Sequence, residues 1–247
     1  GGVPTDEQHI AAFERHWGHP LPRFRGMTTM PMMEAASRGE VDFLYNLGGN
    51  LFAVLPDPEW LRGAFARVGF RIHQDIVFNT STVLEGETVL VLPAQTRYEQ
   101  RGGGTSTSTE RRVRFSPEIP GHPQVGEARP EYEIPCQIAM AAFPLLADAL
   151  SYEDARDIRA EIGRTMPLYA GIEAMDKEGD QIQWGGRILC QGGVFPTPDG
   201  RGRFTVVAPV SIEVPPGAFY LTTRRGKQFN SIVIKDHDPV QGGRGRT

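Results

Sequence analysis

The chain has 247 residues, of which 39% are hydrophobic and 23% charged, and its formal net charge is −4. This balance is ordinary for a globular domain and disfavours general nucleic-acid binding, which usually needs a basic surface, so any anionic ligand must be held by local basic clusters. The two cysteines form no C-x-x-C pair, no apolar run could span a membrane and no secretory signal is visible, so we expect a cytoplasmic protein without a disulfide framework, zinc ribbon or iron–sulfur site in this chain.

The chain is predicted to begin with two helices. An amphipathic pattern predicts a helix from Asp6 to Trp17. A shorter helix is predicted from Pro31 to Arg38, because proline fits a first turn and Gly39 follows the last one.

An alternation of strands and helices comes next. Three apolar strands are predicted at residues 41–47, 70–74 and 88–92. A helix that opens at Asp57 separates the first two strands, and a short helical turn at 79–85 separates the last two. This spacing predicts an α/β fold with a parallel sheet and right-handed crossovers, covered by helices on both faces.

The rest of the chain changes from α/β towards β. Residues 95–129, rich in Gly, Thr, Ser and Arg, are predicted to be a loop, and helices are predicted at 134–150, interrupted by Pro144, and at 151–165. Short strands are predicted at 181–183, 202–207 and 218–223.

Polar residues follow the first two strands, where an open parallel sheet binds its ligands. Gly48, Gly49 and Asn50 end the first strand, and Gln74 and Asp75 end the second. Glycines allow close backbone approach, and Asp75 is an acceptor that suits a ribose hydroxyl or a guanine N–H edge. A nucleotide site and a plain turn with a cap explain these residues equally well. The missing G-x-G-x-x-G and P-loop patterns disfavour a nicotinamide dehydrogenase and a P-loop NTPase.

Two further segments have the composition of anion sites. Residues 102–112 combine glycines, hydroxyls and two arginines, which suits a pyrophosphate or a pterin but also a flexible solvated loop. Residues 222–230 carry three cations, and a basic surface turn is the commoner explanation for them. His16 and His19 lack a third metal ligand, so a surface or packing role is expected.

Four blocks, in this order, resemble the catalytic subunits of bis-molybdopterin-guanine-dinucleotide (bis-MGD) oxidoreductases, and most of all their formate-dehydrogenase-like, acid-resistance-type branch. The blocks are GEVDFLYNLGGN (39–50), Gln74-Asp75 with VLVLPA (89–94), GTSTSTERRVRF (104–115) with ARPEYEI (128–134), and LTTRRGKQFNS (221–231). The resemblance covers essentially the whole chain but a minority of a full-length subunit. Leu51 and Ser108 depart from it, standing where many relatives have Pro and Asn.

This resemblance implies a division into two partial domains. Residues 1–205 would be part of a dinucleotide-binding, Rossmann-like α/β domain with flanking helices, and residues 206–247 the start of a C-terminal β-barrel of the double-psi type. The molybdenum-ligating residue and any iron–sulfur cluster would belong to N-terminal segments outside this chain. The chain alone is therefore expected to be an inactive fragment, whose partners are the remaining N-terminal and C-terminal domains and an electron-transfer subunit.

The resemblance also implies a cofactor site for bis-MGD with molybdenum or tungsten, without catalytic or metal-binding residues in this chain. The expected cofactor-binding residues are Gly48, Gly49, Asn50, Gln74 and Asp75 for the guanosine end, Thr107, Thr109, Glu110, Arg111 and Arg112 near the pterin, and Thr223, Arg224, Lys227 and Gln228 from the barrel. The intact protein would be an oxidoreductase, with formate as the default substrate. The alternatives are a non-redox nucleotide-binding module, a nicotinamide dehydrogenase and a paralogue without a cofactor.

Overall fold

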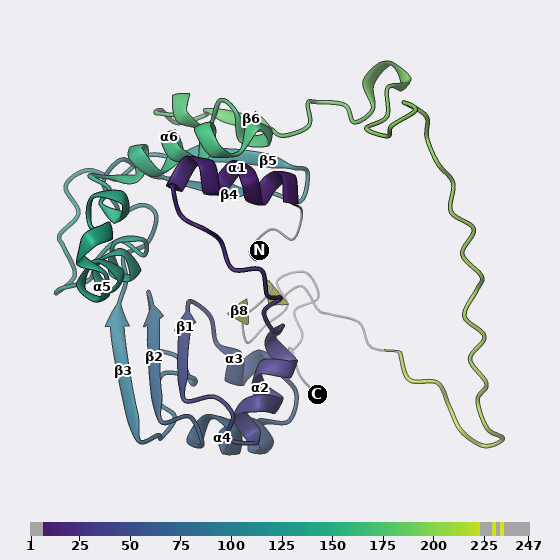
Figure 1. The fold of residues 1–247 in the computed structure, drawn as a ribbon. Helices are drawn as coiled ribbons and strands as arrows, with labels where there is room; N and C mark the ends of the chain where they lie inside the picture. The colour runs from purple at the N-terminus through teal and green to yellow at the C-terminus, as the bar shows by residue number, and fades with distance from the viewer. Residues whose placement is uncertain (1–6, 223–228, 231–232, 235–247) are drawn as a thin grey trace. The chain divides into compact units, whose positions relative to one another are not determined.

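The computed structural model describes residues 7–222, 229–230 and 233–234 (Figure 1). The chain divides into two compact units, Gly1–Trp184 and Gly185–Thr247.

The first unit contains the predicted parallel sheet. Strands β1 (Phe43–Leu47), β2 (Phe70–Asp75) and β3 (Thr88–Pro93) pair in parallel in the order β1-β2-β3. Helices α3 (Leu51–Val54) and α4 (Pro58–Ala66) connect β1 to β2. The α/β prediction is therefore confirmed.

Helices pack on one face of this sheet. The two predicted N-terminal helices are present as α1 (Glu7–Trp17) and α2 (Thr29–Ser37), and α2 packs against α4. The buried core of this region consists of Met33, Ala36, Leu44, Leu61, Ala64, Phe65, Val68 and Leu84. The opposite face carries Phe43, Leu47, Phe70 and Leu90, which are 37% to 51% exposed. The expectation that helices cover both faces is thus not met at these side chains.

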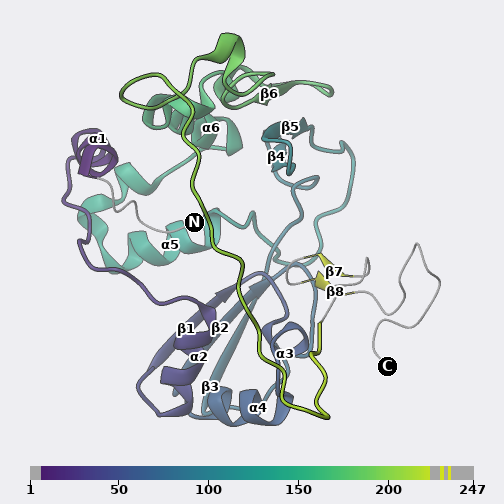
Figure 2. The ribbon, with the colours of Figure 1, turned by 90° about the vertical axis from the view of Figure 1, so that its right-hand side faces the viewer.

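A second sheet takes two strands from the segment that we predicted to be a loop and its third from the predicted strand at 181–183, which is confirmed. Strands β4 (Gly104–Thr107), β5 (Arg112–Ser116) and β6 (Gln181–Gln183) form an antiparallel sheet in the order β4-β5-β6 (Figure 2). The loop prediction for 95–129 is wrong there, because Val113 and Phe115 are buried against Ile172 and Met175. Only these alternate positions of β5 carry apolar side chains, which is a weak sequence signal.

The helical part of the first unit follows the predicted pattern with shifted ends. Helix α5 (Glu133–Ala142) stops before Pro144, and the 3₁₀ turns η1 (Pro144–Leu146) and η2 (Asp148–Leu150) continue the chain. Proline cannot donate the helical hydrogen bond, so the predicted interruption is confirmed. Helix α6 (Ala155–Thr165) begins four residues later than predicted, because Asp154 caps it by accepting from the Arg156 amide at 2.7 Å. Two more 3₁₀ turns, η3 (Pro167–Tyr169) and η4 (Ile172–Ala174), lead towards β6.

Residues 79–85 form no helix. The Asn79 side-chain oxygen accepts from the amides of Ser81 and Thr82, and the Asn79 carbonyl accepts from the Thr82 hydroxyl, which closes a turn instead. The predicted helical turn is therefore wrong, since asparagine competes with the helix for the same amides.

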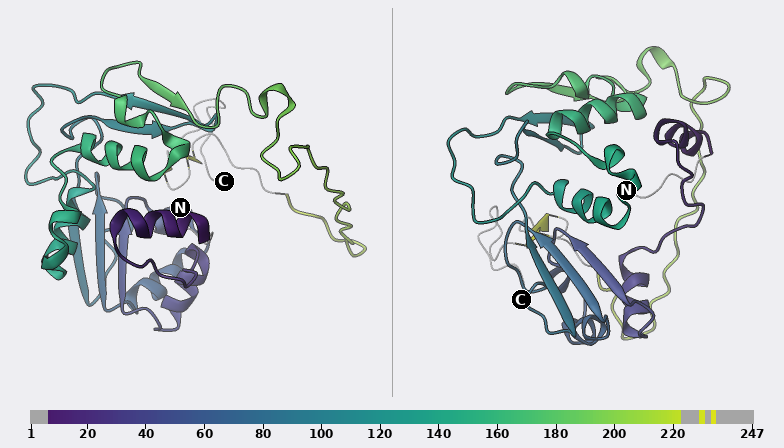
Figure 3. Two further views of the ribbon diagram at one scale, coloured as in Figure 1. Left: turned by 45° about the horizontal axis from the view of Figure 1, so that its top comes forward. Right: turned by 60° about the vertical axis from the view of Figure 1, so that its left-hand side comes forward.

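The second unit contains the 3₁₀ turn η5 (Gln191–Gly193) and two short antiparallel strands, β7 (Phe229–Asn230) and β8 (Val233–Ile234). The strands predicted at 202–207 and 218–223 are not formed over their described residues, where the chain runs extended without pairing (Figure 3). The β-barrel start and the boundary near residue 205 stay predictions.

Candidate functional site

The carboxyl ends of β1 and β2 are joined by hydrogen bonds, and we call this edge of the sheet, where an open parallel sheet binds its ligands, the crevice. The Gly48 amide donates to the Gln74 carbonyl at 2.8 Å, and the Asp75 carboxylate accepts from the Gly49 amide at 3.0 Å. The Asn79 side-chain amide donates to the same carboxylate oxygen at 2.9 Å. Gly48 and Gly49 have φ values of +67° and +106°, which a residue with a side chain would adopt only under strain. The turn after β1 is therefore fixed against the end of β2.

Asn50 connects this turn to the segment that follows β2. Its side-chain oxygen accepts from the Ala53 amide at 3.2 Å, as the cap of α3, and from the hydroxyls of Thr80 and Ser81, both at 2.9 Å. The Ser81 hydroxyl in turn accepts from the Phe52 amide at 2.9 Å. This network orders one wall of the crevice.

Gln74 connects the crevice to the chain before α5. Its side chain is fully buried, accepts from the Tyr45 hydroxyl and donates to the Glu131 carbonyl at 2.8 Å. Both ends of the amide are thus used to position other groups.

Glu131 is a site residue that we did not single out from the sequence. One of its carboxylate oxygens lies 3.9 Å from where a Cβ atom would stand on Gly48. Among the described residues no hydrogen-bond donor contacts this carboxylate, whereas both oxygens of Asp75 accept protein amides. Burial raises the pKa of Glu131, and the Asp75 charge adds to the effect. Its place in the ARPEYEI block was the only sequence signal.

The donors and acceptors of this crevice suit one end of a nucleotide better than the other. The two carboxylates can accept from the N–H edge of a base or from ribose hydroxyls. The same carboxylates repel phosphate groups. The crevice is therefore suited to a nucleoside that donates hydrogen bonds.

The β4–β5 turn forms a second network, around Trp184. Arg111 has a φ of +63°, and its guanidinium donates to the Trp184 carbonyl and lies 5.6 Å from the indole ring centre. The Gln183 side chain donates to the Glu110 carbonyl at 2.9 Å, and the Thr109 hydroxyl donates to the Glu110 carboxylate at 3.1 Å. These contacts hold the turn on β6 and the residue after it.

The expected cofactor-binding residues thus fall into three sets. The structure brings together Gly48, Gly49, Asn50, Gln74 and Asp75 in the crevice. Thr107, Thr109, Glu110, Arg111 and Arg112 lie at the β4–β5 turn. Thr223, Arg224, Lys227 and Gln228 lie outside the described residues. Cofactor binding by each set stays a prediction.

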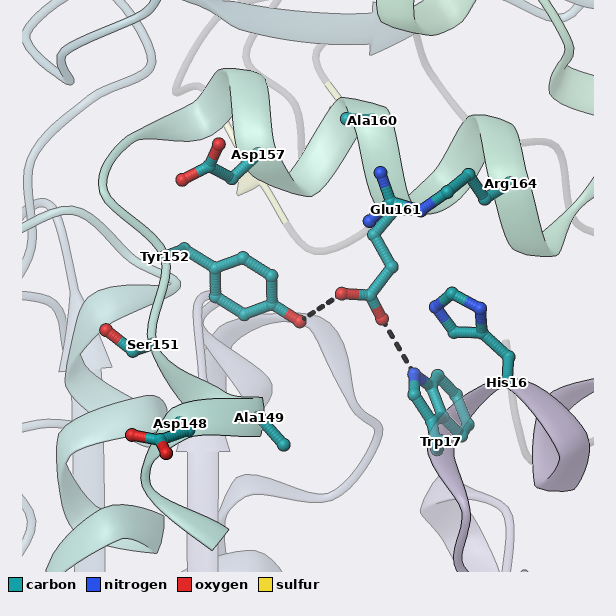
Figure 4. A pocket seen from close by; sticks show the side chains of 10 residues that line it. All are labelled: His16, Trp17, Asp148, Ala149, Ser151, Tyr152, Asp157, Ala160, Glu161 and Arg164. Carbon is teal, nitrogen blue, oxygen red and sulfur yellow. Dashed lines mark hydrogen bonds between the residues drawn. The ribbon is translucent and has the colours of Figure 1, made fainter.

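A pocket of about 380 Å³ between α1, η2 and α6 contains none of these residues (Figure 4). At its centre the Glu161 carboxylate accepts from the Trp17 indole N–H at 2.7 Å and from the Tyr152 hydroxyl at 2.8 Å. Burial raises the pKa of Tyr152, and the hydrogen bond to Glu161 raises it further. The Trp17 contact attaches α1 to α6, and the Tyr152 contact holds the same carboxylate from the segment before α6.

No helix in the described parts of the chain has the length and apolar character needed to cross a membrane.

Comparison with known proteins relates the chain to oxidoreductases, although no protein-family model matches it. It is 30% identical to "Probable oxidoreductase YjgC" of Bacillus subtilis over 80% of this chain and 20% of that protein. It is 31% identical to "F420-dependent formate dehydrogenase subunit alpha" of Methanocaldococcus jannaschii over 91% of this chain and 33% of that protein. It is 28% identical to "Uncharacterized oxidoreductase Rv2900c" of Mycobacterium tuberculosis over 97% of this chain and 32% of that protein. The chain therefore spans a third or less of these relatives, whose names support an oxidoreductase family.

Proposed function

We propose that this chain is part of a molybdopterin-dependent oxidoreductase of the formate-dehydrogenase type, and that its crevice binds the guanosine end of a pterin dinucleotide. The proposal rests on similarity to proteins named oxidoreductases and formate dehydrogenases. The observation that carries it is the crevice at the ends of β1 and β2, where Asp75 fixes the glycine turn and Glu131 has a carboxylate without a donor among the described residues.

Guanine fits these hydrogen-bond acceptors better than adenine does. The Watson–Crick edge of guanine presents an N–H and an amino group side by side, and a carboxylate can accept from both. Adenine has a ring acceptor at the corresponding position, which faces a carboxylate unfavourably. Gly48 leaves room for the ligand, because a Cβ atom there would stand 3.9 Å from the Glu131 carboxylate.

The β4–β5 turn is proposed to contact the pyrophosphate or the pterin. Arg111 is positioned by Trp184, and Arg112, the next residue, begins β5, so the turn carries two cations. Arginine binds phosphate and polar ring edges through its fork of donors. The two sites would then bind different parts of the dinucleotide. The carboxylates of the crevice would contact the nucleoside, and the arginines of the β4–β5 turn would contact the pyrophosphate or the pterin.

The cofactor would be bis-MGD with molybdenum or tungsten, and it would supply the two-electron chemistry when bound. This chain would bind and orient it, while metal ligands and any iron–sulfur cluster would come from N-terminal parts of a longer polypeptide. An electron-transfer subunit is the partner that fits a relative named as a subunit alpha. Formate and the acid-resistance-type branch are the substrate and subfamily that we propose.

Calorimetric titration of the chain with GMP and AMP tests the crevice directly. We expect saturable GMP binding and AMP binding weaker by about tenfold or more, since one charge-assisted hydrogen bond contributes about 1.5–3 kcal/mol. Glu131→Gln should weaken GMP binding by a similar factor, because the new amide donates towards the guanine donors. Glu127→Gln, an exposed change in the same segment, is the matched control and should bind as the unmodified chain does. Equal binding of both nucleotides, or none, would contradict the proposal.

Analysis of the longer protein separates the redox proposal from the alternative of a non-redox nucleotide-binding module. Bound pterin and molybdenum or tungsten are expected. Guanosine nucleotide recovered without pterin or metal would favour the alternative. The 247-residue chain should not oxidise formate, and measurable turnover would refute its role as an inactive fragment.

A further inference from the structure

An extended segment of the second unit has strictly alternating apolar side chains. Phe204, Val206, Ala208, Val210, Ile212 and Val214 occupy every even position. The segment has no helix, turn or strand pairing, and it runs as one extended stretch (Figures 1 and 3). Phe204, Val206 and Val210 are 103%, 96% and 84% exposed. In an extended chain all even side chains point to one face, so an apolar face is presented to solvent.

The backbone of this segment can pair along one edge only. In an extended chain the amide and carbonyl groups of even residues point to one edge and those of odd residues to the other. Pro209 is odd and has no amide hydrogen, so the odd edge is interrupted, whereas the even edge is complete. Among the described residues, the backbone groups of 204–214 form no hydrogen bond. The extended segment thus has no strand partner within the described part of the chain.

The sequence of this segment is complementary to itself about Ala208. In an antiparallel pair of two copies centred there, Arg203 lies opposite Glu213, Phe204 opposite Ile212, and Val206 opposite Val210. Thr205 then lies opposite Ser211. Every apolar residue from 204 to 212 faces another apolar residue, and the two charges of opposite sign meet at both ends.

Other registers lose either part of the apolar pairing or the two ion pairs. A shift by one residue would make one strand pair through the edge that contains Pro209. A shift by two residues in one direction places Gly202 opposite Ile212. In the other direction it keeps the apolar pairs, but Arg203 then lies opposite Pro215 and Glu213 opposite Thr205, so both ion pairs are lost. The register centred on Ala208 is therefore favoured.

We propose that two copies of this chain associate by antiparallel pairing of residues 203–213 about Ala208. The apolar face buries the even side chains of both copies, and both Pro209 residues lie on the outer edges. Two strands of this length form a small interface, so we expect a concentration-dependent equilibrium between monomer and dimer.

Two matched substitutions test the face. Val206→Lys places a charge in the paired apolar face, whereas Val207→Lys introduces the same residue one position later, on the opposite face. Both positions are highly exposed, so neither change should affect folding of the monomer. Sedimentation equilibrium over a wide concentration range should show a dimer for the unmodified chain and Val207→Lys, and association weakened by about tenfold or more for Val206→Lys. A chain that stays monomeric throughout, or equal behaviour of the two variants, would overturn the proposal.

A charge swap tests the register. Arg203→Glu places two glutamates opposite each other and should weaken the dimer, and the double variant Arg203→Glu, Glu213→Arg should restore it. Arg203 also approaches the Asp199 carboxylate at 3.7 Å, but Glu213→Arg cannot repair that pair, so restoration reports the contact between copies. Arg201→Glu is the control and should have little effect. Failure of the double variant to recover, or an equal effect of Arg201→Glu, would refute the register. A monomer whose amides at 204–214 resist hydrogen exchange would refute pairing between copies, because the segment would then pair within one polypeptide.

Discussion

Two regions of the first unit bury an arginine in the same way. In the parallel-sheet region (residues 29–94) the guanidinium of Arg71 lies 5.1 Å from the ring centre of Phe65, and in the hairpin region (residues 96–184) that of Arg159 lies 4.8 Å from the ring centre of Phe115. Arg71 donates to two carbonyls of a neighbouring loop, and Arg159 donates to one. A buried arginine therefore attaches a loop to the core in both regions.

The two arginines differ in what offsets their burial. Arg71 donates to the carbonyls of Leu84 and Glu85 at 2.6 and 2.7 Å, and burial alone lowers its pKa. Arg159 donates to the carbonyl of Gly102 at 3.0 Å; burial lowers its pKa, and the nearby Asp154 carboxylate partly reverses the effect. Carbonyl dipoles and an aromatic face can therefore hold a buried cation where no carboxylate is near.

The largest expected effect comes from removing these arginines. Arg71→Ala should lower the free energy of unfolding by about 3–4 kcal/mol, because it leaves two loop carbonyls without a donor and opens a cavity. Arg159→Ala should cost less, about 2–3 kcal/mol, since its second acceptor, the Ala155 carbonyl, lies within α6 and is 3.3 Å away. Urea unfolding followed by circular dichroism measures both. An unchanged free energy of unfolding in Arg71→Ala, or a larger decrease in Arg159→Ala than in Arg71→Ala, would contradict this ranking of the two arginines.

A second expected effect concerns pH and arises in the parallel-sheet region. His73 is fully buried, and burial, with the charge of Arg71, lowers its pKa to about 4 from an ordinary value of 6.5. Above pH 6.5 the His73 imidazole is neutral in both the folded and the unfolded chain. Between pH 6.5 and about 4 the imidazole binds a proton in the unfolded chain but not in the folded one. The free energy of unfolding therefore falls from about pH 6.5 and levels off near pH 4, by up to about 3 kcal/mol.

His73→Leu should flatten the stability profile in this window, although its stability at neutral pH can differ. The free energy of unfolding at several pH values between 4 and 7 measures the effect. A variant that keeps the full slope would show that other groups cause the loss.

The smallest expected effect tests how the hairpin region holds α1. Glu161→Gln should cost about 1 kcal/mol, because the amide cannot accept from both Trp17 and Tyr152 as well as the carboxylate does. Proteolysis in the connection at 18–28 should become faster as α1 detaches more often. Glu153→Gln, which changes an exposed ion pair with Arg101, is the control and should leave the cleavage rate unchanged. Unchanged cleavage in Glu161→Gln would mean that other contacts hold the helix.

The same two regions differ in how far the sequence predicts them. The parallel-sheet region was predicted in type and order because its strands are apolar runs with clear stops, such as Gly48 after β1. The hairpin was missed because β4 contains only glycine, threonine and serine, and its burial depends on Val113 and Phe115 of the neighbouring strand and on distant packing partners. Side-chain composition alone does not report such contacts.

The candidate site shows the same limit. Asp75 and the glycine turn were predicted to lie together because parallel strands end at one edge, and the structure brings them together. Glu131 was missed because it reaches the crevice through a hydrogen bond between its carbonyl and Gln74, a contact between segments far apart in the chain. Local patterns predict where a strand ends, but not which later segment returns to it.

The order β1-β2-β3 has a consequence for synthesis on the ribosome. Each strand pairs with the next one along the chain, so the hydrogen-bonded ladder of the parallel sheet is complete once Pro93 has left the exit tunnel. The glycine turn and Asp75 can then form their contacts while the hairpin region is still being translated. Glu131 arrives only afterwards, so the crevice acquires its last carboxylate after the sheet beneath it has assembled.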